Sequence, residues 1–246
     1  MTTVRILINN ENIIPDSLIE VKGNNFDYLI KVMRLKINDN ILIFNGCDGE
    51  FLAKIININK KSCLIRIIQK TQDQEEVPSI ILAFAPVKNV RIDFIAAKAT
   101  EIGVGKFQPI ITNHSIVDKI NEKRFRANIK EACEQCERTF VPELLPIIKL
   151  DKYLNNIENN KNLILCDESI RNNSANQILS QIKFTKNKEN IIFIGPEGGF
   201  SKKEFEIFYK IQNLHKISLG NNILRADTAI ISALTLINQF VNQEKL

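Results

Sequence analysis

The chain has 246 residues, of which 44% are hydrophobic and 25% are charged, and its net charge at neutral pH is +5. These proportions are those of an ordinary folded globular protein, and they exclude a disordered or a fibrous chain. The apolar runs are far shorter than the roughly 20 residues that a membrane helix needs, so no membrane-spanning segment is expected. The mild positive charge favours association with a polyanion such as nucleic acid but does not establish it.

The first part of the chain, up to about residue 68, is predicted to be a small β module. Short apolar or alternating runs are broken there by turn residues. Asn45-Gly46 and Asp48-Gly49 accept positive φ, so the runs on either side are predicted to pair antiparallel. One helical patch, at residues 25–35, interrupts the strands. Because small β modules must close or cover their edges, we expect a barrel.

The polar stretch at residues 70–79 is the best candidate for a linker, because it carries three acids and ends near Pro78. It predicts two domains, residues 1–72 and 73–246. Beyond it, the run at 80–86 is apolar throughout, as in a strand that is buried on both faces, and the stretches at 162–168 and 190–196 each contain a similar apolar run.

Segments in which apolar residues recur with helical spacing alternate with these strands. Apolar residues recur at three and four from Ile92 to Ile102, before Gly103. A second helix is marked by Phe125, Ile129, Ala132, Cys133 and Cys136. The alternation predicts an α/β domain with a parallel sheet, whose ligands bind outside the carboxyl ends of the strands.

Five scattered cysteines do not form a disulfide framework and suit a reducing compartment. Because no secretory signal is recognisable either, the predicted location is the cytoplasm. Cys133 and Cys136 form a C-x-x-C pair, but zinc needs four ligands and the only histidines are His114 and His215. We therefore predict no metal site.

The stretch "IGPEGGFSKKE" at residues 194–204 joins a predicted strand to a predicted helix. A phosphate cradle is the first hypothesis, but the glycine spacing matches no phosphate-binding motif. Glu197 adds negative charge, which suits a neutral or cationic ligand such as an adenosyl sulfonium. Ser201 and Glu204 are spaced as a capping box. A plain glycine-rich turn is the alternative.

A second stretch, "ISLGNNILRADTAIISAL" at residues 217–234, breaks at Gly220, and a helix is predicted to begin near Asp227. Arg225 and Asp227 flank that start, where the simplest interpretation is a surface charge and an N-cap. Two such loops at one end of a sheet would share a pocket. Two such loops together indicate a binding site more specifically than either loop does alone.

Together these stretches resemble the 16S ribosomal RNA (uracil(1498)-N(3))-methyltransferases of the SPOUT superfamily. The similarity extends to "KNVRIDFIAAKATEIGVGKFQPI" (88–110), "EACEQCERTFVPEL" (131–144) and "LIKVMRLKINDNILIFNG" (29–46). The resemblance implies an N-terminal PUA-like β-barrel followed by an α/β domain with a trefoil knot. It also implies a homodimer that uses S-adenosylmethionine as its cofactor.

The resemblance implies the following site residues. The cofactor would be bound by Cys166, Gly195, Glu197, Gly198, Leu219, Gly220, Ile223, Leu224 and Arg225. The reaction would use Arg225 to stabilise the uracil anion, with Glu197 or Asp227 as candidate base. RNA would be contacted by Arg34, Lys88, Arg91 and Arg138.

The chain departs from the family pattern at Ala226 and Asp227, where the family usually has Thr and Glu, and at Phe26 and Asp27, where it has paired histidines. The implied function is methylation of uracil N3 in 16S rRNA within the small ribosomal subunit. The alternatives are a knotted 2′-O-ribose methyltransferase and a non-catalytic RNA-binding module that retains the cofactor pocket.

Overall fold

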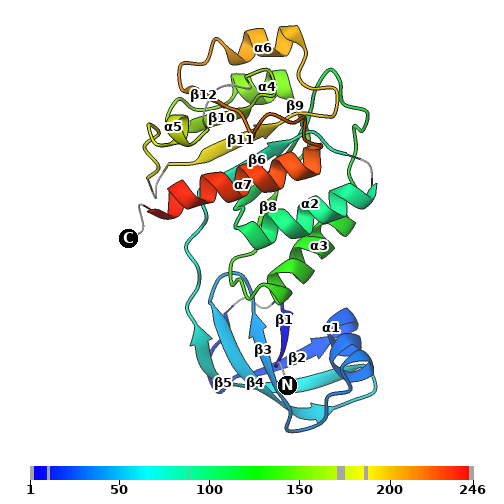
Figure 1. Cartoon of the computed structure of the whole chain (residues 1–246). Helices are drawn as coiled ribbons and strands as arrows, with labels where there is room; N and C mark the ends of the chain where they lie inside the picture. The colour runs from blue at the N-terminus through cyan, green and yellow to red at the C-terminus, as the bar shows by residue number, and fades with distance from the viewer. Residues whose placement is uncertain (1–2, 10–11, 88, 171–174, 186–187, 244–246) are drawn as a thin grey trace. The chain divides into compact units, whose positions relative to one another are not determined.

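The computed structural model describes residues 3–9, 12–87, 89–170, 175–185 and 188–243. The chain forms two compact units (Figure 1). The N-terminal unit consists of Met1–Val77 and Lys130–Val141, and the C-terminal unit of Pro78–Ile129 and Pro142–Leu246. The first unit thus includes a segment, 130–141, that lies far along the sequence and that its pattern did not assign there.

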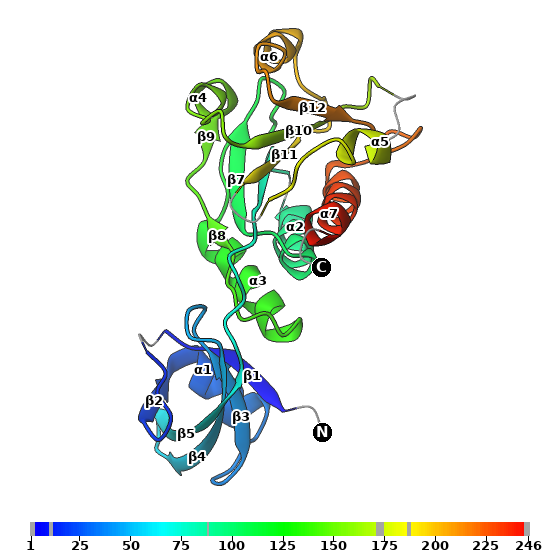
Figure 2. The ribbon, with the colours of Figure 1, turned by 90° about the vertical axis from the view of Figure 1, so that its left-hand side faces the viewer.

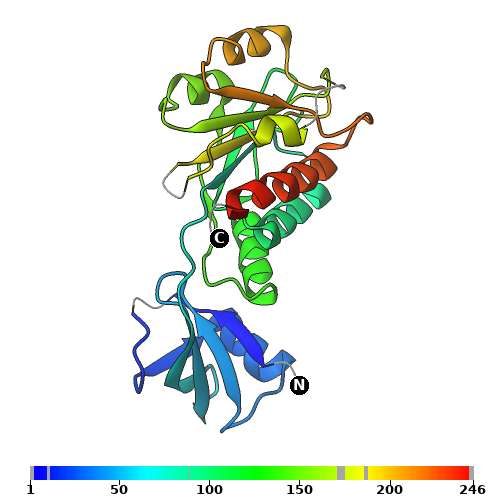
Figure 3. The same ribbon diagram turned by 60° about the vertical axis from the view of Figure 1, so that its left-hand side comes forward.

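The N-terminal unit is a curled five-stranded sheet (Figure 3) in the order β1-β3-β4-β5-β2. β1 pairs parallel with β3, and the other neighbours are antiparallel. The expected barrel is present as an open, curled sheet, with β1 and β2 at the two ends of the described strand path. Its elements are β1 (Val4–Leu7), β2 (Leu18–Lys22), α1 (Gly23–Asp27), the π-helix η1 (Tyr28–Val32), β3 (Asn40–Phe44), β4 (Glu50–Ile58) and β5 (Ser62–Gln72).

The predicted hairpin between β3 and β4 is confirmed, and its turn depends on glycine. Gly49 has φ of +94°, and a Cβ at this position would lie 2.3 Å from the carbonyl oxygen of Gln72. Every second residue of β3 then faces the core, because side chains alternate along a strand. Ile41 and Ile43 are fully buried as a result.

Arg5 is the buried polar centre of this unit. Its Nε donates to Glu50 Oε2 at 2.6 Å, and its two terminal nitrogens donate to the carbonyl oxygens of Cys133 at 2.5 Å and Arg138 at 2.8 Å. The guanidinium also lies 3.8 Å from the centre of the Phe44 ring. The Arg5 side chain is only 4% exposed, so one cation ties the segment 130–141 to the sheet.

Replacing Arg5 with Met is expected to lower the free energy of unfolding by about 3–5 kcal/mol, because Glu50 would remain buried without its partner. Urea unfolding measures the change. The matched control is Lys22→Met, which removes an exposed ion pair with Glu20 and should cost about 0.5 kcal/mol or less. Equal stability of the two variants would contradict the central role of Arg5.

The C-terminal unit is built on a parallel sheet in the order β12-β10-β11-β6-β7-β8, with β9 paired to β7. The predicted parallel arrangement of the three apolar runs is therefore confirmed. The strands are β6 (Ile80–Phe84), β7 (Lys106–Ile111), β8 (Glu143–Leu144), β9 (Ile148–Lys149), β10 (Asn162–Cys166), β11 (Asn190–Ile194) and β12 (Leu214–Ile217).

Helices cover both faces of this sheet (Figure 2), with α2 and α7 on one face and α4 and α6 on the other. β11 is buried along its whole length, as a central strand between two helical layers must be. The helices are α2 (Asn89–Ile102), α3 (Glu122–Gln135), α4 (Leu150–Asn155), α5 (Ala175–Leu179), α6 (Lys202–Phe208) and α7 (Ala226–Gln243).

The two helices predicted from periodicity are confirmed. α2 ends at Ile102, directly before Gly103, which has φ of +107°. α3 buries Phe125, Ile129 and Cys133. α7 begins at Ala226, one residue earlier than expected, so Asp227 lies in the first turn rather than at the N-cap.

The chain leaves the edge strand β12 and enters α7, which packs against α2 and the central strand β11 (Figures 1 and 3). This return from the edge to the centre carries the segment after β12 across the end of the sheet. None of the described helices is long and apolar enough to cross a membrane.

Candidate cofactor and methyl-transfer site

A cavity of about 200 Å³ lies where three neighbouring parallel strands end. β10 lies between β11 and β12 with aligned register, so the loops after all three strands leave from the same edge of the sheet. The cavity is lined by Cys166, Asp167, Glu168 and Ser169 after β10, by residues 194–200 and Phe205 after β11, and by Leu219, Gly220, Asn222, Leu224, Ala226 and Ala229 after β12.

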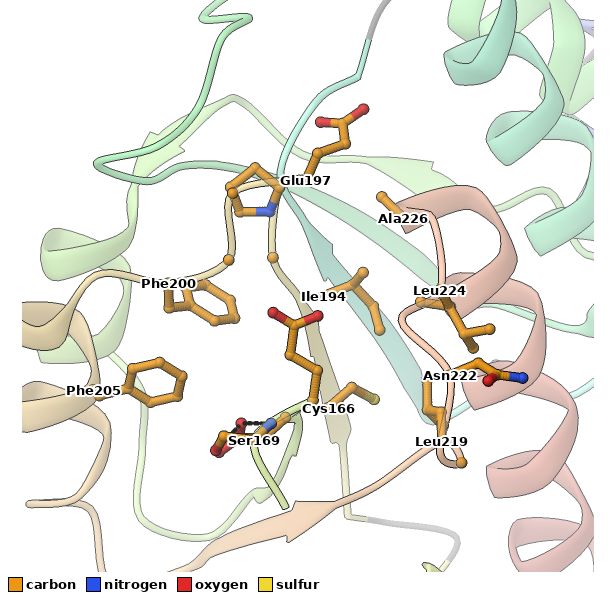
Figure 4. A pocket seen from close by; sticks show the side chains of 18 residues that line it. Cys166, Ser169, Ile194, Glu197, Phe200, Phe205, Leu219, Asn222, Leu224 and Ala226 are labelled. Carbon is orange, nitrogen blue, oxygen red and sulfur yellow. Dashed lines mark hydrogen bonds between the residues drawn. The ribbon is translucent and has the colours of Figure 1, made fainter. Parts of the chain in front are cut away.

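The walls differ in character (Figure 4). Phe200 and Phe205 form one side, while Leu219, Asn222 and Leu224 form the opposite side. The Glu197 side chain stands at the rim and points away from the two aromatic rings. An apolar slot with a polar rim suits a flat ring system attached to charged groups.

The glycine-rich loop after β11 approaches its neighbours closely. Gly199 has φ of +66°, a conformation that residues with side chains rarely adopt. A Cβ at Gly195 would lie 3.1 Å from the ring of Phe200. The backbone at Gly195 therefore packs directly against the Phe200 ring, and both line the cavity.

Two further contacts hold this loop in place. The predicted capping box is confirmed, since Ser201 Oγ accepts from the Glu204 backbone and Glu204 Oε2 accepts from the Ser201 backbone at 2.7 Å. From the loop after β7, His114 Nδ1 donates to the carbonyl oxygens of Gly198 at 2.9 Å and Gly199 at 3.1 Å. No sequence pattern predicted this contact of His114 with the glycine-rich loop.

The charge of the cavity is one-sided. Asp167, Glu168 and Glu197 line it, and no lysine or arginine is among the lining residues in the part of the chain that the structure describes. Such a wall attracts a ligand that carries positive charge. This agrees with the interpretation of Glu197 drawn from the sequence.

Asp167 lines this cavity and has a buried carboxylate oxygen without a hydrogen-bond partner. Its Oδ1 accepts from the backbone and hydroxyl of Ser169, at 2.9 Å and 2.6 Å. Its Oδ2 is buried and has no hydrogen-bond partner, although the residue is only 4% exposed. A buried carboxylate oxygen without a partner is costly, so Asp167 is suited to receive a donor from a bound ligand.

Cys166 contributes shape rather than reactivity. Burial, together with the negative charge of the adjacent Asp167, raises the pKa of the Cys166 thiol far above its ordinary value. The thiol is therefore protonated near neutral pH and is not a nucleophile.

Of the residues that the sequence assigned to the cofactor, all line the cavity except Ile223 and Arg225. Ile223 is 69% exposed, and Arg225 is also exposed at the start of α7. The sequence did not single out Glu168, Phe200 or Phe205. The position of Asp167 directly after an apolar strand was the one signal that could have found it.

The candidate catalytic carboxylates are brought together by an arginine that the sequence assigned to RNA. Arg91 Nη1 lies 3.3 Å from Glu197 Oε1, and Arg91 Nε lies 3.9 Å from Asp227 Oδ2. The three side chains come from α2, the loop after β11 and the first turn of α7.

The other predicted RNA contacts have different surroundings. Arg34 is exposed on the N-terminal unit, with φ of +56°. Lys88 lies outside the described residues. Arg138 is only 8% exposed, and its Nε lies 3.3 Å from Glu75 Oε2, so its burial contradicts the expectation that it faces outward to phosphates.

The C-x-x-C pair does not form a metal centre with other described residues, among which there is no group of three or more candidate ligands. Cys133 is buried, while Cys136 is only half-buried, although both mark the apolar positions of the predicted helix. Burial raises the pKa of Cys133 to about 12. Cys133 therefore acts as a packing residue.

Comparison with known proteins identifies the family. Residues 74–238 match the model of the RNA methyltransferase domain, and residues 21–68 match that of the RNA methyltransferase PUA domain. The ribosomal RNA small subunit methyltransferase E of Rickettsia conorii is 35% identical over 94% of this chain and 93% of its own length. The chain belongs to the ribosomal RNA small subunit methyltransferase E family. It is an RNA methyltransferase, as the resemblance implied.

Solved structures of methyltransferases agree over nearly the whole length. The ribosomal RNA small subunit methyltransferase E of Neisseria gonorrhoeae, bound to S-adenosyl methionine, has a TM-score of 0.83 and 27% identity, covering 97% of this chain and 98% of its own. A putative methyltransferase of Legionella pneumophila in complex with the same cofactor has a TM-score of 0.85 and 29% identity, with the same coverage.

Replacing Asp167 with Asn is expected to weaken binding of S-adenosylmethionine by about tenfold or more, since a hydrogen bond to a charged group contributes about 1.5–3 kcal/mol. The same change should leave the ligand-free protein as stable as before or more so, because the unpaired charge is removed. Calorimetric titration and thermal unfolding measure the two effects. Unchanged affinity would show that Oδ2 does not face the ligand.

Proposed function

We propose that this chain transfers a methyl group from S-adenosylmethionine to N3 of a uracil in the 16S rRNA of the small ribosomal subunit. The observation that carries the proposal is the cavity at the edge of the sheet where β10, β11 and β12 end. Its walls are apolar, and its charged lining residues are acidic. Family membership supports ribosomal RNA as the substrate. The motifs that resemble the uracil N3 methyltransferases support N3 of uracil as the atom that accepts the methyl group.

The cavity fits the proposed cofactor. The adenine ring suits the slot between Phe200 and Leu219, and the cationic groups suit the carboxylates of Asp167 and Glu168. The two solved relatives that hold this molecule support the same conclusion. When bound, S-adenosylmethionine supplies an electrophilic methyl group, so the protein must orient the acceptor, exclude water and manage a proton.

The acceptor atom requires a base. As the new N3–C bond forms and the S–C bond breaks, the N3 proton must pass to a protein group. Glu197 and Asp227 are the candidates, because Glu197 lines the cavity, Asp227 directly follows the lining residue Ala226, and both side chains are partly exposed. Since N3 is a base-pairing atom, the uracil must be unpaired or flipped out to reach them.

Two alternatives are less well supported. A knotted 2′-O-ribose methyltransferase would carry an N-x-G-x-x-x-R stretch where this chain has "NVRIDFIAAK". A non-catalytic RNA-binding module would have no need for a complete cavity with its carboxylates in place.

We also propose, from the resemblance alone, that the protein acts as a homodimer in the cytoplasm.

The product identifies the reaction. We expect undermethylated small subunits incubated with the protein and labelled S-adenosylmethionine to yield N3-methyluridine, detected by nucleoside mass spectrometry. Free 16S rRNA in a parallel incubation distinguishes the assembled subunit from naked RNA as substrate. Label on a ribose oxygen, or no label on uracil N3, would overturn the proposal.

Glu197→Gln and Asp227→Asn identify the base. The variant that lacks the base is expected to lose about 10²–10⁴-fold in kcat while it still binds the cofactor, because proton transfer contributes about that factor. Single-turnover rates and calorimetric titration measure the two properties. If both variants retain wild-type turnover, neither carboxylate accepts the proton.

A further inference from the structure

Two arginines lie near the proposed methyl-transfer site, and their surroundings differ. Arg225 is exposed, does not line the cavity and has no ion pair among the described residues, although the sequence points to it as the stabilising cation. Arg91 contacts both candidate carboxylates at the rim. The two ion pairs place a single guanidinium between Glu197 and Asp227.

We propose that Arg91 is the catalytic cation that stabilises the uracil anion during methyl transfer, rather than one of several phosphate contacts. This inference rests on the proposed function and names a role within it. Its basis is the grouping of Arg91, Glu197 and Asp227 from three different elements at the rim of the cavity.

The position of Arg91 suits this role. Its side chain is 37% exposed, which leaves part of the guanidinium open to an incoming ligand. Five N–H donors in a rigid fork allow it to contact a carboxylate and a carbonyl oxygen together. Among the described residues no lysine or arginine lines the cavity wall itself, and Arg91 is the cation that contacts Glu197 and Asp227, so it is available to the negative charge that develops on uracil.

The surrounding carboxylates fix the direction of the guanidinium. Glu197 belongs to the loop that His114 and the capping box hold, and Asp227 belongs to the first turn of α7. A cation held by two such groups needs little reorganisation when charge develops beside it, which is the main source of electrostatic catalysis. When the N3 proton leaves, the negative charge moves to the O2 and O4 carbonyls, where the guanidinium can donate.

The chain offers a matched control close by. Arg124 of α3 forms an ion pair with Asp93, which lies two residues from Arg91 on α2. Arg124→Gln therefore removes an arginine–carboxylate pair from the same helix without touching the cavity. Arg225→Gln tests the rival cation.

The experiment compares Arg91→Gln, Arg91→Lys, Arg225→Gln and Arg124→Gln by kcat, by KM for small subunits and by the affinity for S-adenosylmethionine. Arg91→Gln is expected to lower kcat by about 10²–10³-fold, the effect of removing one donor to a developing oxyanion. Its cofactor affinity and its KM should change by less than about threefold. Arg91→Lys should restore part of the rate, and Arg124→Gln should match the wild type.

The pH profile separates a catalytic role from a structural one. Without the cation, formation of the uracil anion is less favourable, so the rate of Arg91→Gln should continue to rise at pH values where the wild-type rate has levelled off. A merely structural change would lower the rate by the same factor at every pH. Such a parallel loss would overturn the inference.

Three other results would also overturn it. A higher KM at unchanged kcat would make Arg91 an RNA contact, and loss of cofactor affinity would make it a structural clamp between two loops. If Arg225→Gln, and not Arg91→Gln, lowers kcat while KM and cofactor affinity stay nearly unchanged, the role belongs to Arg225. In each case the wild type still forms N3-methyluridine; if it does not, the proposed function fails and the inference with it.

Discussion

The parallel pairing of β10, β11 and β12 is the constraint on which the site depends. These strands are separated in sequence by helices α5 and α6, yet they lie side by side in aligned register. Parallel strands send all their following loops to one edge of the sheet. Three loops that have no local reason to meet thus close around a single cavity, and the glycines in them allow the backbone to form its wall.

Charge organises that cavity. Its wall carries carboxylates from two of the three loops, and one of these, Asp167, keeps a buried oxygen without a partner. Such an atom is tolerated where a ligand supplies the donor, since the free energy lost in the empty protein is regained on binding. At the rim, Arg91 balances Glu197 and Asp227. The interior is thereby suited to a cationic group, and at the rim the guanidinium of Arg91 is the proposed donor to the uracil anion.

Local patterns predicted a large part of this arrangement. Asn45-Gly46 and Asp48-Gly49 gave the hairpin, Gly103 the end of α2, and Ser201 with Glu204 the capping box, because each depends on neighbours within a few residues. The family resemblance, confirmed by the matched domains, added the identity of the fold. The burial of Arg138 and the ion pairs of Arg91 were missed, because a charged residue has the same local sequence pattern whether its partner is solvent or a distant carboxylate.

The sequence by itself thus determined the hairpin of β3 and β4, the apolar strands β6, β10 and β11, the helices α2, α3 and α7, and the two loops with glycines. These features follow from side-chain periodicity and from backbone freedom, which are local properties. Only the tertiary structure decided that Asp167 joins the cavity, that His114 braces the glycine loop and that Arg91 stands between Glu197 and Asp227. Each of these contacts joins residues from different strands or helices, and their distance is set by the strand order of the sheet, which no periodicity records.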